Sequence, residues 1–281
     1  MVFRIESPNS INTFKQCPRK YFYSYKAQLP RKDSIHTIAG KAVHETLEYL
    51  FQIKGVDETN FELDIQHKLI EFFNKNWVNY IPKLIQLDTD KETIRNFYDG
   101  CLIMINNFLV SFIEKLNQEI NNNSFKEAFE KLKPKTEVYL KSEALNVHGF
   151  VDAIHEDNNE ITIIDYKTGS KDEITEEYRL QLAIYSLVYK ENFNKTPKKV
   201  GISFLKHCSE KFIEVDEDFL NLAKKECKEI QTKNISNDIK DYPKNPGPLC
   251  KWRTGQCDFY NLCFGQQKLD NFIQIEEKKG L

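Results

Sequence analysis

Excess charge and long apolar runs are both lacking in this sequence. Of its 281 residues, 40 are Lys or Arg and 42 are Asp or Glu, which gives a formal net charge of −2 at pH 7. A chain with this balance is not a globally basic coat for nucleic acid, so any contact with an anionic polymer has to be local. The most apolar stretch, Cys101 to Ile113, is too short to span a bilayer and contains Asn106 and Asn107. The sequence therefore predicts no membrane role.

A signal peptide, a Walker A phosphate loop and internal repeats are lacking as well. The first ten residues, MVFRIESPNS, contain no apolar core of a signal peptide, so we expect a cytoplasmic protein. Because no G-x-x-x-x-G-K-[ST] loop occurs, we expect no helicase in this chain. The length predicts one large domain, or a core with a substantial insertion.

Local basic clusters are the remaining electrostatic way to contact an anionic polymer. Each of them could equally be a solvated face, since charge runs usually are. The clusters are Lys15, Arg19, Lys20 and Lys26; Arg31 and Lys32; Lys131, Lys133 and Lys135; and Lys195, Lys198 and Lys199.

The seven cysteines are an odd number, which argues against a disulfide framework and for a reducing compartment. Four look organised, because Cys250, Cys257 and Cys263 cluster near the C-terminus and Cys17 stands alone in FKQCPRKYFY. Four thiolates can hold structural zinc or an iron–sulfur cluster, or remain unligated. The other three, Cys101, Cys208 and Cys227, are expected to be ordinary buried thiols.

The most informative segment is GFVDAIHEDNNEITIIDYKTG, residues 149–169. Apolar residues predict a first strand over 150–154 and a β-branched second strand over 161–164, joined by a polar turn. Asp152 and Asp165 should then lie near each other. Because strand side chains alternate faces, Asp165 and Lys167 share one face and Tyr166 points to the other.

Two carboxylates beside a cation provide the oxygen ligands that a hard divalent ion needs, with a lysine left for the reacting group. Phosphodiester hydrolysis is the chemistry that this set favours. The alternative is a surface hairpin with an ordinary ion pair. However, Ile163 and Ile164 make the run before Asp165 typical of a buried central strand, where a charge is rare unless it is paired or binds metal.

This hairpin resembles the core of the PD-(D/E)xK nucleases, in the branch that contains the RecB nuclease domain, AddB and the CRISPR-adaptation exonucleases. The resemblance implies that Asp152 is the first acid and that Asp165, Tyr166 and Lys167 form the D-x-K element. It also implies a metal-dependent nuclease.

The segment after the hairpin, 176–190, has the apolar spacing of an amphipathic helix. Gln181 and Tyr185 lie four residues apart, hence on one face. The resemblance implies a Gln-x-x-x-Tyr motif that lines the active site and orients DNA. Alternatively, both residues occupy the solvent edge of the helix.

A second predicted helix, 39–51, carries His44 beside its apolar stripe. From the residues alone, a histidine there is a hydrogen-bonded core residue. The resemblance implies a metal ligand instead, because the RecB-like branch has a histidine in a G-x-x-x-H context like Gly40 to His44. Glu48, one turn further on, and Glu137, on the strand before the hairpin, are additional acids that could belong to the site.

The cysteine layout is similar to that of the cluster-bearing nucleases of this branch. The resemblance implies that Cys17, Cys250, Cys257 and Cys263 hold a [4Fe–4S] cluster that joins the two ends of the chain. One departure is that six residues separate Cys250 from Cys257, where the branch usually has two. Structural zinc remains the alternative.

The predicted organisation is an α/β (α+β) fold with a mixed central sheet flanked by helices. Residues 40–133 should be mostly helical, with breaks near Gly55, Pro82 and Asn121 to Asn123. The further expected elements are strands near 136–141, 146–154, 161–167, 199–206 and 211–216 and a helix near 217–233. The expected domains are a single nuclease domain over 1–281, with a helical insertion at 52–133, a catalytic core at 134–233 and a cysteine segment at 240–265 that pairs with Cys17.

These patterns predict a metal-dependent DNA exonuclease that acts on single-stranded ends in recombination, repair or replication. His44, Asp152, Asp165 and the Tyr166 carbonyl would bind Mg²⁺ or Mn²⁺, and Lys167 would orient the nucleophile or offset charge on the phosphate. A helicase or recombinase is the expected partner. The alternatives are a structure-specific or site-specific endonuclease, and a DNA-binding module that is stabilised by a cluster and has lost activity.

Overall fold

The computed structural model describes residues 4–87, 89–253 and 255–265, and the chain divides into two compact units. One unit is Asp33–Lys225, and the other combines Met1–Lys32 with Glu226–Leu281. All predicted catalytic residues belong to the first unit, and the four organised cysteines belong to the second. The expectation of a single domain over 1–281 stays a prediction.

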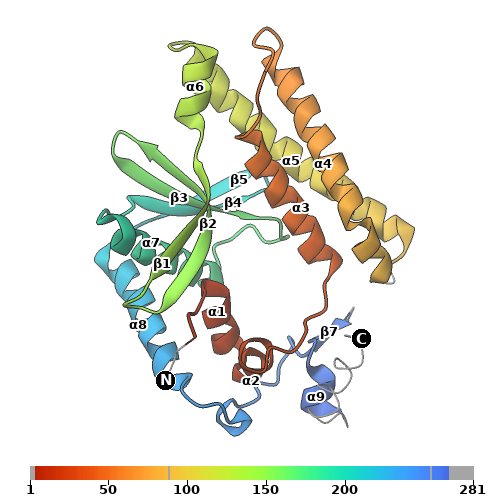
Figure 1. The fold of residues 1–281 in the computed structure, drawn as a ribbon, viewed down its shortest axis with the longest axis vertical. Coiled ribbons are helices and arrows are strands. Elements are labelled where there is room, and N and C mark those ends of the chain that lie inside the picture. Colours follow the sequence, from red (N-terminus) through yellow and green to blue (C-terminus); the bar gives the residue numbers. More distant parts are fainter. Residues whose placement is uncertain (1–3, 88, 254, 266–281) are drawn as a thin grey trace. The chain divides into compact units, whose positions relative to one another are not determined.

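A five-stranded sheet forms the centre of the first unit, with the order β1-β2-β3-β4-β5 (Figure 1). Neighbouring strands in this sheet are antiparallel except for β3 and β4, which are parallel, so the sheet is mixed as predicted. The strands are β1 (Lys135–Ser142), β2 (Val147–Asp157), β3 (Glu160–Lys167), β4 (Lys199–Phe204) and β5 (Ser209–Glu214).

The hairpin of β2 and β3 turns at Asn158 and Asn159, whose φ angles are 48° and 66°. Asparagine tolerates this left-handed region, which is what a two-residue hairpin turn requires. In the resulting register, Ala153 pairs with Ile164. The next pair toward the end of β3 is therefore Asp152 and Asp165, which brings the two predicted acids together.

The parallel connection between β3 and β4 contains helix α7 (Glu176–Phe193), which packs on β1, β2, β3 and β4. Its N-terminus is capped by Thr175, whose hydroxyl accepts the Tyr178 N–H. Every residue from Leu180 to Tyr189 is buried. The apolar stripe predicted for this helix is therefore only part of a segment that is buried on all sides. Helix α8 (Glu217–Lys233) follows β5.

Within the described residues of the first unit, four helices precede the sheet, and α3, α4 and α5 lie on the side of the sheet opposite α7 (Figure 1). The helices are α3 (Ile35–Leu50), α4 (Phe61–Gln86), α5 (Lys91–Ile120) and α6 (Phe125–Leu132). Buried residues of α3, α4 and α5 form one apolar cluster with Ala153, Ile164 and Tyr166 of the sheet. A second cluster joins α3, α4, α5 and α6.

The predicted helix breaks near Gly55 and at 121–123 are confirmed, but the predicted break at Pro82 is wrong. Pro82 lies inside α4. The carbonyl that a proline there leaves without a helical donor belongs to Val78, whose side chain is 60% exposed, so water can satisfy it. Leu84, two residues further along α4, is fully buried and keeps the helix packed.

Helix α5 is, within the described ranges, the one helix whose length and composition alone would allow it to cross a membrane. Core helices pass the same test, so a single helix of this kind carries little weight. Cys101, Met104 and Leu109 of α5 are buried in the two apolar clusters.

The second unit joins an N-terminal and a C-terminal segment through a buried hydrogen-bond network. The Glu6 carboxylate accepts from Tyr21 Oη at 2.5 Å and from Asn234 Nδ2 at 2.8 Å, and Tyr242 Oη donates to Asn234 Oδ1 at 2.9 Å. The elements of this unit are α1 (Pro8–Gln16), α2 (Pro18–Tyr21), the π-helix η1 (Phe22–Lys26), the 3-10 helix η2 (Ile239–Asp241), the paired strands β6 (Lys251–Trp252) and β7 (Gly255–Gln256), and α9 (Tyr260–Phe264).

Candidate active site at the β2–β3 hairpin

The two predicted acids and the predicted lysine meet at the end of the hairpin. Asp165 is 3% exposed, and its Oδ2 lies 2.6 Å from Lys167 Nζ. Asp152 Oδ2 accepts the Tyr166 N–H at 2.7 Å, so the first acid is tied to the backbone of β3. Burial, followed by the charge of Asp152, raises the pKa of Asp165, although Lys167 opposes this. The alternative interpretation, a surface hairpin with an ordinary ion pair, is therefore wrong, because Asp165 is buried.

Gln181 of α7 connects these groups. Its Nε2 donates to Asp165 Oδ1 at 2.9 Å and to Tyr185 Oη at 3.0 Å, and its Oε1 accepts from Lys167 Nζ at 2.9 Å. An amide nitrogen has two hydrogens, so these bonds use both. Gln181 and Tyr185 are 6% and 7% exposed, so neither occupies a solvent edge. The geometry makes Gln181 a positioning residue for Asp165 and Lys167.

Tyr178 is a site residue that the motifs did not indicate. Lys167 Nζ lies 4.8 Å from the centre of its ring, a cation–π distance. Tyr178 precedes Gln181 by three residues on α7, hence lies on the same helical face. That spacing is the signal that could have identified it.

His44 of α3 and Glu137 of β1 complete a group of metal-ligand type with Asp152. His44 Nδ1 lies 3.5 Å from Asp152 Oδ1, and one ligand atom from each of the three residues lies within 4.8 Å of the others. Burial lowers the pKa of His44, but the hydrogen bond and charge of Asp152 prevail and raise it. Burial and the charge of Asp152 raise the pKa of Glu137, whose φ is 49°. A strained backbone at such a position is typical of functional sites.

The donor set fits a hard divalent ion. Carboxylate oxygens and one imidazole suit Mg²⁺ or Mn²⁺, and a soft thiolate is not among them. Asp165 adds a buried carboxylate beside this group, while Glu48, which accepts from Gln52 at 2.9 Å, is close enough for its charge to raise the pKa of Glu137. The Tyr166 ring points away, toward Phe108 at 5.4 Å, and a metal bond to the Tyr166 carbonyl stays a prediction.

The four organised cysteines are free thiols within the second unit. Cys17 Sγ accepts the Lys20 N–H at 3.5 Å, and the Cys257 N–H donates to the Cys250 carbonyl at 2.9 Å. Burial raises the pKa of Cys257 and of Cys263, and the charge of Cys17 adds to both shifts.

Of the three cysteines expected to be ordinary buried thiols, Cys101 and Cys227 are buried and Cys208 is not. Cys208 is exposed because it lies in the turn between β4 and β5, with a φ of 49°. Composition and sequence position alone do not indicate this turn geometry.

Most of the basic clusters are neutralised by neighbouring carboxylates. Ion pairs join Lys15 to Glu226, Lys131 to Glu119, Lys135 to Glu156 and Lys198 to Glu160, with nitrogen–oxygen distances between 2.5 and 3.2 Å. Arg19 Nε donates to the Tyr242 carbonyl at 2.7 Å. These clusters are therefore largely solvated faces with local pairs, which was the alternative interpretation.

Comparison with known proteins points in one direction. A family model described as the PD-(D/E)XK nuclease superfamily matches residues 6–264, a range that includes the hairpin, His44, Gln181 and the four organised cysteines. The CRISPR-associated exonuclease Cas4 of Francisella tularensis subsp. novicida (strain U112) is 26% identical over 124 residues. That match spans 44% of this chain and 59% of the Cas4 protein, so it covers less than two thirds of that relative.

Among solved structures, the crystal structure at 2.19 Å of a candidate exonuclease from Eubacterium rectale has the same fold. Its TM-score is 0.51, and the match covers 95% of this chain and 89% of that one. The sequence identity is 11%, so this likeness concerns the fold alone.

Proposed function

The chain belongs to the PD-(D/E)XK nuclease superfamily, and from this premise we propose that it is a divalent-metal-dependent DNA exonuclease acting on single-stranded ends. The observation that carries this proposal is the buried constellation of Asp165, Lys167 and Gln181 beside the His44, Glu137 and Asp152 group. These residues come from three strands and two helices, so the tertiary fold is needed to bring them together.

His44, Glu137, Asp152 and Asp165 are the residues that would hold Mg²⁺ or Mn²⁺. When bound, such an ion supplies a water of lowered pKa and positive charge beside the phosphate. Lys167 keeps its proton at neutral pH. Burial lowers its pKa, but the charge and hydrogen bond of Asp165, together with the charge of Asp152, outweigh burial and raise the pKa. Its ammonium group can donate to a phosphate oxygen and offset the charge that develops there.

A cavity next to the catalytic strand supports the preference for single strands. It has a volume of about 300 Å³, and its lining includes Thr168 and Gly169, which directly follow Lys167. The rings of His36 and Phe97 also line it, with centroids 4.8 Å apart, and Lys206 adds a cation. Aromatic and cationic side chains of this kind stack on unpaired bases and contact the backbone without reading sequence.

A cleavage assay with Mn²⁺ tests the proposal on linear single-stranded, linear duplex and covalently closed circular single-stranded DNA. We expect rapid loss of the linear single strand, sparing of the circle, and weaker cleavage as salt rises. Asp165→Asn should abolish cleavage. Asp172→Asn is its matched control, because Asp172 is an exposed acid that bonds Ser209 and Lys211.

Two outcomes of this assay would contradict the proposal. Rapid cutting of the closed circle would identify an endonuclease. Equal activity of Asp165→Asn and wild type would remove Asp165 from the chemistry.

We also propose that Cys17, Cys250, Cys257 and Cys263 hold a [4Fe–4S] cluster. In the described part of the chain, no group of three or more cysteines has all its sulfur atoms within 4.8 Å of one another, whereas the ligand atoms of His44, Glu137 and Asp152 lie that close. A four-iron cluster holds its thiolates farther apart than a single zinc ion does, which favours the cluster over tetrahedral zinc.

Metal analysis of anaerobically purified protein tests this second proposal. We expect brown protein with about four iron and four sulfide per chain. Cys17→Ser should lower the iron content, and Cys208→Ser, at an exposed cysteine outside the set, should leave it unchanged. Colourless wild-type protein with about one zinc per chain would identify the alternative.

The cellular role that we propose follows the RecB-like branch: end processing in recombination, repair or replication, in the cytoplasm. A helicase or recombinase partner would supply single strands from duplex DNA. If so, cleavage of blunt duplex should require an added helicase, and cleavage of blunt duplex by the chain alone would contradict this partner.

A further inference from the structure

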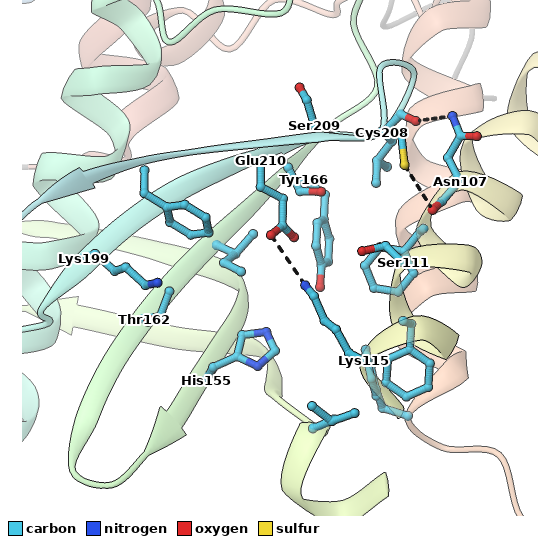
Figure 2. A pocket seen from close by; sticks show the side chains of 18 residues that line it. Asn107, Ser111, Lys115, His155, Thr162, Tyr166, Lys199, Cys208, Ser209 and Glu210 are labelled. Carbon is cyan, nitrogen blue, oxygen red and sulfur yellow. Dashed lines mark hydrogen bonds and ion pairs between the residues drawn. The ribbon is translucent and has the colours of Figure 1, made fainter. Parts of the chain in front are cut away.

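A second cavity, distinct from the one beside Thr168 and Gly169, lies between the sheet and α5. It has a volume of about 390 Å³. Figure 2 shows its lining, in which β2, β3, β4 and β5 face side chains of α5. The register explains the pattern: His155, Thr162 and Lys199 pair in one row across β2, β3 and β4.

Gly201 shapes one wall of this cavity, because the absence of a side chain there lets the Phe212 ring pack directly against β4. A Cβ atom there would lie 2.4 Å from Phe212 Cδ1 and 2.7 Å from the Lys211 carbonyl. The Phe212 ring of β5 therefore lies over β4 and forms one apolar wall, while Phe108 and Phe112 of α5 are among the other residues that line the cavity. Between these aromatic residues, the sheet contributes Thr162, Ile164 and Ser203 to the lining.

Several polar side chains line this cavity and lack protein partners. Among the described residues, His155, Thr162, Ser111 and the Tyr166 hydroxyl form no hydrogen bond with another side chain or backbone group. Burial and the charge of Lys115 lower the pKa of His155 to about 4, so its ring is neutral and can both donate and accept. Unpaired polar groups beside apolar walls are the usual composition of a ligand pocket.

The charges at this cavity favour an anion. Lys199 Nζ lies 4.6 Å from the centre of the Phe212 ring and, within the described ranges, has no carboxylate at ion-pair distance. Lys115 Nζ forms an ion pair with Glu210 Oε2 at 3.5 Å. The cavity therefore contains one compensated cation and one uncompensated cation.

We propose that this cavity binds a small aromatic anion, a flat ring system that carries one acidic group. Its rings would lie between the aromatic walls, its acidic group would pair with Lys199, and its polar edge would reach His155 and Thr162. The volume is in the range of about 300–1,000 Å³ found for small-molecule sites. Two sources share this chemistry: aromatic carboxylic acids and nucleoside monophosphates.

A fluorescence titration with 8-anilinonaphthalene-1-sulfonate tests the site in EDTA, so that no divalent ion can hold the probe at the hairpin. We expect one probe per chain, and weaker binding of the uncharged N-phenyl-1-naphthylamine. Lys199→Gln should weaken sulfonate binding about 10-fold. Lys198→Gln, at a neighbouring lysine paired with Glu160, is the matched control and should bind as wild type. Ser111→Trp, which fills the cavity from α5, should abolish binding.

Competition distinguishes the two sources. Displacement of the probe by dAMP but not by deoxyadenosine would assign the site to nucleotides, and displacement by 1-naphthoate alone would assign it to aromatic carboxylic acids. The proposal is overturned if neither dAMP nor 1-naphthoate displaces the probe, or if several probe molecules bind per chain. It is also overturned if Lys199→Gln and Ser111→Trp bind the probe as tightly as wild type does.

Discussion

Gln181 joins three groups of the site, and its replacement separates positioning from folding. Gln181→Met keeps the side-chain shape and removes the hydrogen bonds to Asp165, Lys167 and Tyr185. Hydrogen bonds to charged groups contribute about 1.5–3 kcal/mol each and neutral ones about 1 kcal/mol. Because Lys167 and Asp165 still pair with each other, we expect the free energy of unfolding to fall by about 3 kcal/mol rather than by the full sum.

Gln181→Met should also slow catalysis, because it changes the positions of Asp165 and Lys167. Asp165 Oδ1 loses its donor and Lys167 loses its acceptor, so both can rotate away from the reacting phosphate. Misplacement of about 1 Å costs about 100-fold in rate. Both amide hydrogens of Gln181 are used within the protein, so it has none left for DNA. We therefore expect kcat to fall about 100-fold with KM unchanged.

The assay combines urea unfolding with steady-state cleavage of a linear single strand. Ser186→Ala is the control, because Ser186 is buried on the same helix but donates only to the Leu182 carbonyl, at 2.8 Å. It should lose little stability and no activity. A Gln181→Met enzyme with wild-type kcat, or with a raised KM alone, would refute the positioning role.

Two further predictions concern stability. Asn234→Ala removes a buried donor to Glu6 and an acceptor for Tyr242, so the free energy of unfolding should fall by about 2–4 kcal/mol. The control Asn237→Ala removes one exposed contact to Lys26 and should lower the free energy of unfolding by less than about 1 kcal/mol. Equal losses of the two variants in urea unfolding would contradict a stabilising role of the buried network. His155 has a folded pKa of about 4, below its unfolded value, so the unfolded chain binds more protons between about pH 4 and 6.5. Its contribution, up to about 3 kcal/mol, is complete above about pH 6.5 and is lost as the pH falls toward 4; His155→Gln should flatten this part of the stability profile.

The hairpin was predicted well from the sequence, because the residues that determine its strands and turn are close together in the chain. Alternation with period two set the strands, and two asparagines set the turn and hence the register of Asp152 and Asp165. Gln181 was found by its motif, but its burial was not predicted. Its helix is buried on all sides, and helical periodicity indicates only which face is apolar.

Long-range features were harder to predict from the sequence. His44 is more than 100 residues before Asp152, and only the family resemblance indicated that the two would meet. Glu137 was considered as a possible acid of the active site. However, nothing in the neighbouring sequence indicates the left-handed φ that this residue adopts there. The packing of Phe212 on Gly201 depends on a contact between two strands, and the sequence pattern of a single strand does not contain it.

The acids of the candidate site also predict how the protein responds to metal. Glu137, Asp152 and Asp165 place three carboxylates together, with Lys167 and His44 as the cationic or ionisable partners. A divalent ion that binds only the folded chain would relieve their repulsion, and it stabilises by about 2.7 kcal/mol when its concentration is 100 times Kd. We therefore expect Mn²⁺ to raise the melting temperature of wild type. Asp152→Asn should lose most of this increase, because it removes a ligand, while melting at least as high as wild type without metal, because it removes a repelling charge. An equal increase with Mn²⁺ in wild type and Asp152→Asn would place the ion elsewhere.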